Sequence, residues 1–183
     1  MAVREPVVVI APNSFKGSVS ATEAAAAIAA GVRRVWPQAD LRSCPMADGG
    51  DGTLDAVLSA GGERRTARVS GAAGASVDAA YGLIANDTAI IESAQVVGLT
   101  DAAATVHPVE TRSTRGLGEL VRILLDAGVK QFLIGLGGSS TNDAGAGLLA
   151  ALGLALVDAN GQVIEPTPAG LAALSRVDAS ALD

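Results

Sequence analysis

The sequence contains few of the residues that carry redox, zinc or covalent chemistry. Its 183 residues include one cysteine, one histidine and 2% aromatic residues. The single cysteine, Cys44, cannot form a disulfide within the chain, which fits a reducing compartment. One histidine and one cysteine are too few ligands for zinc. They also give no supported Cys–His pair for nucleophilic catalysis.

Positive charge is scarce as well. Thirteen Lys and Arg residues stand against nineteen Asp and Glu, for a formal net charge of −6. Since no basic stripe is available to neutralise a phosphate backbone, we expect no nucleic-acid partner. The longest run without a charge, 144–157, is shorter than the ~20 residues that cross a bilayer, and no signal segment opens the chain. We expect no membrane partner and a cytoplasmic location.

Apolar residues (49%) and 22 glycines are arranged in alternating strand-like and helix-like segments. The β-branched run 7–10 predicts a strand that is buried on both faces. Ser20 and Glu23 have the spacing of a capping box, which predicts the start of a helix. Three apolar residues then recur on one face of this helix: Ile28, Val32 and Val35.

The middle of the chain reads differently. Segments 63–69, 76–83 and 88–92 are strand-like and have turns rather than helices between them, which indicates entry into a second lobe. A helix with Gly128 as its C-cap follows, then a buried strand at 132–134. The apolar face of that helix has five residues: Leu117, Leu120, Val121, Leu124 and Leu125.

These segments predict an α/β fold with two lobes and mostly parallel sheet flanked by helices. We expect residues 1–75 to form the first part of a Rossmann- or flavodoxin-like lobe. Residues 76–183 would form the first, incomplete part of a second α/β lobe. Near the end, 154–157 and 162–163 predict a hairpin on an Asn-Gly turn.

Three polar loops follow predicted strands, where ligands bind in open α/β sheets. In the first loop, residues 13–18, Lys16 follows Ser14 and is the only cation, so it could neutralise a phosphate or carboxylate. The alternative is a solvated surface lysine. In the second loop, residues 48–53, Asp48 and Asp51 could bind a cation or accept a proton. The alternative there is an Asp-Gly turn that caps a helix.

The third loop, 135–143, is rich in glycine and hydroxyl groups and leads into a predicted helix at about 144–152. Backbone N–H groups and hydroxyls at a helix N-terminus can hold the phosphates of a nucleotide. Asp143 could hold Mg²⁺ or cap the helix. The loop is neither a Walker A motif nor a dinucleotide fingerprint.

A weaker candidate is the segment 111–116. Arg112 and Arg115 could clamp a carboxylate or phosphate, while Ser113 or Thr114 could equally be a plain N-cap. His107, the only histidine, lies in a predicted loop and has no supporting partner.

Four motifs in this order resemble the glycerate kinase family: 14–18, 47–53, 113–120 and 135–143. The resemblance implies transfer of the ATP γ-phosphate to a hydroxyl of D-glycerate, with Mg²⁺, between two α/β lobes. Members of this family are longer, so we expect a truncated chain that matches their N-terminal half. Asn13 stands where the family usually has Asp.

Chemistry and resemblance together assign the site residues. Asp48 and Lys16 are the expected catalytic residues, and Asp51 and Asp143 the expected metal ligands. The expected substrate-binding residues are Ser14, Lys16, Asp48, Gly49, Gly50 and Arg115. The expected ATP-binding residues are Gly137, Gly138, Ser139, Ser140, Thr141 and Asn142.

Two other functions remain open from the sequence. A truncated, non-catalytic chain could bind a small anion or hydroxy acid without turning it over. An oxidoreductase or isomerase could use the same loops, although neither a dinucleotide fingerprint nor a well-placed histidine favours one. Unpaired sheet edges would favour association, which leaves a homo-oligomer open.

Overall fold

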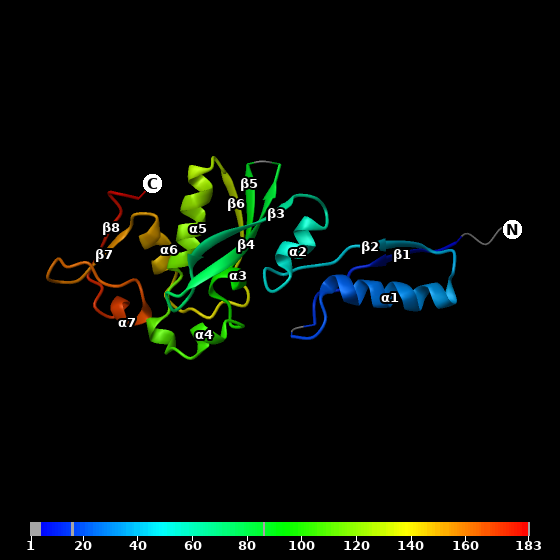
Figure 1. Cartoon of the computed structure of the whole chain (residues 1–183), viewed down its shortest axis with the longest axis horizontal. Helices are drawn as coiled ribbons and strands as arrows, with labels where there is room; N and C mark the ends of the chain where they lie inside the picture. Colours follow the sequence, from blue (N-terminus) through cyan, green and yellow to red (C-terminus); the bar gives the residue numbers. More distant parts are fainter. Residues whose placement is uncertain (1–4, 16, 86, 183) are drawn as a thin grey trace.

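The computed structural model describes residues 5–15, 17–85 and 87–182. The chain forms two regions, which follow one another along the long axis of the molecule (Figure 1). We call the N-terminal region the arm; it consists of β1, α1 and β2. The larger region, which we call the body, contains the elements from α2 to β8. Residues 44–52 connect the two regions.

The arm is a β–α–β unit with β1 at Val7–Ile10, α1 at Ala21–Val35 and β2 at Asp40–Ser43. The two strands pair in parallel, as the crossover through a helix requires. The predicted capping box is confirmed: Glu23 N donates to Ser20 Oγ at 3.2 Å, and Ser20 N donates to Glu23 Oε2 at 2.9 Å.

Burial in the arm is less than the sequence predicted. Val7 and Val9 are 55% and 62% exposed, so the expectation of a strand buried on both faces is wrong. The reason is that α1 covers only one face of this two-stranded sheet. The predicted apolar stripe of α1 is also largely open, with Ile28 and Val35 exposed. Its buried residues are small: Ala21, Ala24 and Ala25.

The body is built on a four-stranded sheet in the order β3-β4-β5-β6. The strands are Glu63–Ser70, Ser76–Ile84, Thr88–Glu92 and Gln131–Gly135. β3, β4 and β5 are antiparallel, and β6 adds to β5 in parallel. The α/β class with sheets flanked by helices is confirmed, but the sheet is not mostly parallel. The uninterrupted strands 63–92 are joined by short turns, which can link only antiparallel neighbours.

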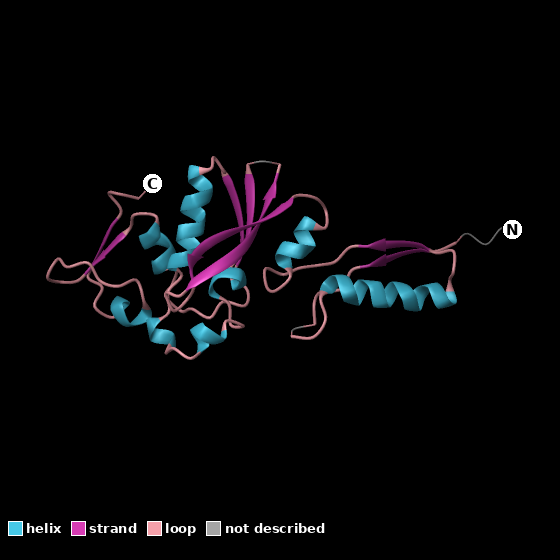
Figure 2. Ribbon diagram, viewed as in Figure 1, coloured by secondary structure: helices cyan, strands magenta, loops and turns pink. Residues whose placement is uncertain are grey.

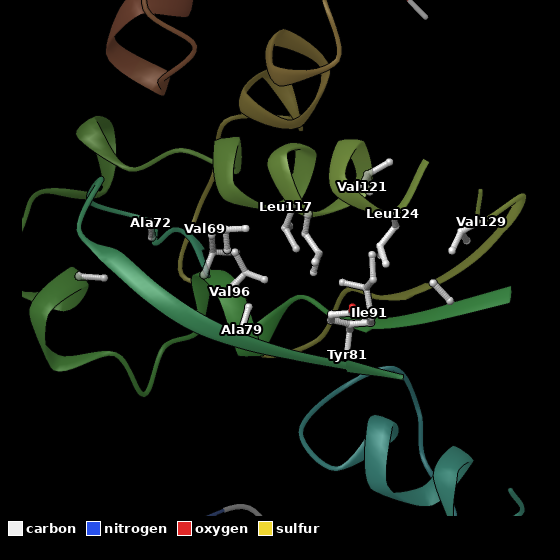
Figure 3. Packing of buried hydrophobic residues seen from close by; sticks show 14 residues of the cluster. Val69, Ala72, Ala79, Tyr81, Ile91, Val96, Leu117, Val121, Leu124 and Val129 are labelled. Carbon is white, nitrogen blue, oxygen red and sulfur yellow. The ribbon is translucent and has the colours of Figure 1, made fainter. Parts of the chain in front are cut away.

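Helices lie on both faces of this sheet (Figure 2). Their bounds are Thr53–Leu58 (α2), Ala94–Val97 (α3), Ala102–Thr105 (α4), Arg115–Asp126 (α5), Ala146–Ala151 (α6) and Pro168–Leu171 (α7), with a 3₁₀ turn at Val109–Thr111 (η1). α5 covers one face and forms the main core with Tyr81 and Ile91 (Figure 3). On the other face, Leu54 of α2 packs with Ala80 and Ile90.

The predicted helix over 117–125 is confirmed as α5, with Gly128 in the left-handed conformation after it (φ 88°). Four residues of the predicted apolar face are buried: Leu117, Leu120, Val121 and Leu124. Leu125 is 38% exposed, because it lies at the margin of the face toward the sheet.

The predicted lobe boundary at residue 75 would divide β3 from β4, which pair along their whole length from Glu63–Leu83 to Ser70–Ser76. The break in strand pairing lies earlier, between β2 and α2. Near the C-terminus, β7 (Ala155–Val157) pairs with β8 (Arg176–Asp178), while Val163 makes only an isolated bridge to Val157. None of the helices in the described part of the chain has the length and hydrophobicity to span a membrane.

Candidate functional site

The second and third loops pack directly on each other at the end of β6. Gly137 N donates to Gly49 O at 2.7 Å. A Cβ on Gly137 would lie 2.5 Å from Gly50 Cα, and one on Gly135 would lie 2.8 Å from Gly49 O. Real side chains do not tolerate such distances, so these glycines allow two backbones to touch. The close approach that these glycines allow is between the two loops.

The first loop joins this pair through Ser14, whose Oγ donates to Asp51 O at 3.3 Å. Together the three loops enclose a depression of about 310 Å³. It is lined by Asn13, Ser14, Asp48, Gly50, Asp51, Gly137 and Gly138. Residues from three separate stretches of the chain therefore share one polar concavity.

Two carboxylates lie in this depression, and both are exposed. Asp48 Oδ1 accepts a hydrogen bond from Gly50 N at 3.1 Å, which fixes the side chain over its own turn. Asp51 lies against Gly138: a Cβ placed on Gly138 would be only 2.8 Å from Asp51 Oδ1. Thr53 Oγ1 donates to Gly50 O at 2.7 Å and closes the turn at the start of α2.

A second, larger cavity of about 480 Å³ adjoins the depression and shares Ser14 and Asp51 with it. One wall is formed by residues before α1 and in its first turn, including Ser18 and Ser20. The other is formed by the start of α2, including Asp55. The two concavities together follow the junction of arm and body. Lys16, predicted to act here, lies outside the described residues.

Beyond Gly138 the third loop turns away from the depression. Ser140 N donates to Val97 O at 2.7 Å, and Leu99 N donates to Gly138 O at 2.8 Å, so the loop runs beside the end of α3. Ser139 and Thr141 share a hydroxyl hydrogen bond of 2.8 Å. Ser140 is buried, and its Oγ finds no partner among the described residues. Of the predicted ATP-binding set, only Gly137 and Gly138 line the depression; Ser139, Ser140, Thr141 and Asn142 do not.

Asp143 is enclosed by protein donors at the start of α6. It is 1% exposed, and its Oδ2 accepts from Thr114 N at 2.7 Å, Thr114 Oγ1 at 2.8 Å and Gly147 N at 3.0 Å. Oδ1 accepts from Gly145 N at 3.2 Å. Protein donors thus occupy both oxygens, and N–H groups at the start of α6 already donate to Asp143 and Thr114. The carboxylate joins α5 to α6 and caps the start of α6, which is the alternative to a metal role that the sequence left open. The N–H groups predicted to cradle an anion at that helix are already bonded to protein oxygens.

The arginines of segment 111–116 also lie elsewhere. Arg112 donates to the carbonyl oxygens of Thr105, His107 and Ser140 and so holds loops together. Arg115 lines a separate depression between the β3–β4 turn and residues 165–167. Arg115, predicted to bind substrate, therefore does not line the depression that contains Asp48, because α5 starts on the far side of the sheet from α2.

Sequence reasoning gave no role to Glu92, the last residue of β5. The structure buries it (1% exposed) beside the second loop, where Leu54 N donates to its Oε2 at 3.0 Å. The available signal was an acidic residue that ends an otherwise apolar strand. Among the described residues, no group of three or more His, Cys, Asp or Glu side chains is gathered as a metal cluster.

The fold and the loops define a mixed α/β protein with a polar depression beside its strand ends. A sequence model described as the glycerate kinase family matches residues 8–183. The chain belongs to the glycerate kinase family.

Relatives with the same name as the family agree with this assignment. The chain is 44% identical over 178 residues to the glycerate kinase of Halalkalibacterium halodurans, covering 96% of this chain and 47% of that protein. It is 43% identical over 178 residues to the glycerate 2-kinase of Escherichia coli K12, with the same coverage. A crystal structure assigned as glycerate kinase 2 from Salmonella typhimurium LT2 superposes with a TM-score of 0.81 at 44% identity, covering 97% of this chain and 49% of that one. The chain spans about half the length of the curated relatives it matches.

Proposed function

We propose that the chain carries the acceptor-side loops of an ATP-dependent kinase that phosphorylates D-glycerate. The observation that carries this proposal is the backbone contact between Gly137 and Gly49. This contact brings the third loop against the loop of Asp48 and Asp51, and the hydrogen bond from Ser14 Oγ to Asp51 O adds the first loop to the same depression. The relative from Escherichia coli is named a glycerate 2-kinase, which favours the 2-hydroxyl as the acceptor.

Phosphoryl transfer depends on positioning and charge stabilisation more than on covalent chemistry. In our proposal Asp48 accepts the proton of the attacking hydroxyl, since it is exposed and its turn fixes its direction. Ser14 and Gly50 bind the hydroxy acid. Gly137 and Gly138 form a wall without side chains, along which phosphate oxygens can approach. Lys16 would neutralise a phosphate or the substrate carboxylate.

The donor set of the depression suits Mg²⁺, which prefers oxygen ligands and often binds through one or two carboxylates plus substrate phosphates. Asp51 would hold the ion, in a depression that Asn13 also lines. The ion would offset the negative charge on the phosphates of ATP. A cytoplasmic location, where ATP is available, is part of the same proposal.

Replacing Asp48 by Asn tests the proposed base. The variant keeps the size of the side chain but cannot take a proton, so we expect turnover to fall by at least ~10²-fold. The measurement is ADP release with D-glycerate in a coupled assay. The matched control is Asp158→Asn, which changes an Asp that also sits in an exposed turn, where Asn160 N donates to it at 2.9 Å. Equal turnover in both variants would remove the catalytic role of Asp48.

A second candidate is binding without catalysis, which the polar lining of the same depression by Ser14, Asp48 and Asp51 would also allow. A non-catalytic chain would bind glycerate or phosphate in the same depression without consuming ATP. Titration calorimetry with D-glycerate and with inorganic phosphate, run beside the ADP-release assay, separates the two. Heat of binding without ADP release supports the binding function.

A further inference from the structure

Glu92 is a buried acid whose oxygens accept from backbone N–H groups at the end of the second loop and the start of α2. Oε2 accepts from Leu54 N at 3.0 Å, and Oε1 accepts from Gly52 N at 3.4 Å and from Gln95 Nε2 at 3.3 Å. Among the ion pairs of the described residues, none involves Glu92. Backbone donors at the start of α2 and one side-chain amide therefore satisfy both of its oxygens.

The same residue lies at the attachment point of the third loop. Glu92 is in register with Gly135, the last residue of β6, and Ser93 N donates to Gly135 O at 2.8 Å. Ser93 Oγ donates to Gly137 O at 3.3 Å. One strand end thus holds the second loop through the side chain of Glu92 and the third loop through the backbone and side chain of Ser93.

From this geometry we propose that Glu92 is a positioning residue, which sets the second loop in register with the third. Its two oxygens hold Gly52 and Leu54 on either side of Thr53, directly after Asp48 and Asp51. Shifting these residues would move both carboxylates relative to Gly137. If Glu92 were only a cap for α2, its loss would lower stability without changing the contact between the loops.

Glu92→Gln tests this role because the amide keeps the shape and one acceptor. Its NH₂ group cannot accept a hydrogen bond, so a backbone N–H that donated to the carboxylate loses its acceptor and stays buried and unpaired. The matched control is Glu119→Gln. Glu119 is also a glutamate that accepts a distant backbone N–H, that of Ser70, at 2.8 Å, but it lies on α5, on the face opposite α2.

The first measurement is amide hydrogen exchange of the chain in D₂O. In Glu92→Gln we expect exchange at Leu54 and Gly137 to rise about 10-fold, while the amide of Leu120 in α5 reports global unfolding. Glu119→Gln should leave Gly137 unchanged relative to Leu120. Unchanged exchange at Gly137 in Glu92→Gln, or an equal rise in both variants, would overturn the positioning role. Glu92→Asp, which keeps the charge on a shorter side chain, replaces Gln if the latter does not fold.

The second measurement is kinetic and rests on the proposed kinase function. In protein that turns over D-glycerate, Glu92→Gln should lower kcat about 10-fold and change KM by less than about 2-fold, because misplaced carboxylates affect the reaction more than binding. Unchanged kcat would overturn the effect on turnover. Absence of turnover in the unsubstituted protein would count against the proposed function alone, since hydrogen exchange still decides whether Glu92 positions the loops.

Discussion

The arm and the body have equally clear local signals but very different burial. The arm has a complete capping box on α1 and a regular parallel strand pair. Its buried apolar residues are nevertheless few: Ile10, Ala21, Ala24 and Ala25. The body has a continuous core between α5 and the sheet (Figure 3) and a second cluster under α2.

This difference shows that local signals decide which elements form, while burial decides how stable they are. A two-stranded sheet with one helix buries little apolar surface, and such units are marginal in water. Trp36 and Val35, at the end of α1, are 48% and 68% exposed. We therefore expect the arm to open more readily than the body. Three substitutions test this difference, from the largest effect to the smallest.

Gly137→Ala should have the largest effect, because the new Cβ would lie 2.5 Å from Gly50 Cα, a backbone atom that cannot move alone. We expect a loss of about 3 kcal/mol in the free energy of unfolding of the body, measured by urea denaturation, together with loss of turnover. Gly31→Ala is the matched control, since a Cβ on Gly31 meets nothing within 4 Å. Equal stability of the two variants would mean that the loops do not need their close approach.

Asp143→Asn comes next. The amide can replace one carboxylate oxygen, but its NH₂ group must face the N–H of Gly145 or the donors from Thr114 and Gly147. An unpaired buried donor costs about 1–3 kcal/mol, so we expect about 2 kcal/mol of destabilisation in urea. Hydrogen exchange of α1 should not change, because the loss is confined to the body.

The Mg²⁺ dependence of turnover separates this structural role of Asp143 from a metal role. Asp143→Asn should leave the Mg²⁺ concentration for half-maximal turnover unchanged, whereas Asp51→Asn should raise it. A higher Mg²⁺ requirement in Asp143→Asn without loss of stability would restore the role that the sequence suggested.

Features governed by neighbouring residues could be predicted from the sequence. The Ser20–Glu23 capping box, the apolar face of α5 and the cap at Gly128 depend on residues within a few positions of each other. The rule that ligands bind at strand ends also pointed to the loops of Asp48 and Gly137, which the structure brings together.

Features governed by distant partners could not be predicted. Asp143 looked like a metal ligand because its main partner, Thr114, is 29 residues away. Arg115 looked like a substrate clamp because the sequence does not show on which face of the sheet α5 begins. Ile28 formed a regular apolar stripe, but periodicity indicates only which face could be buried, not whether another element covers it.

Gly31→Ala, the smallest expected effect, tests the arm alone. Gly31 lies inside α1 and is exposed, where Ala is favoured over Gly by about 0.5–1 kcal/mol. Since a gain of about 0.5 kcal/mol slows exchange at least about twofold, we expect hydrogen exchange of α1 to slow by about 3-fold. The urea midpoint of the body should stay constant. If the urea midpoint rose together with the protection of α1, arm and body would unfold as one cooperative unit. The scarcity of burial in the arm would then not be what limits its stability.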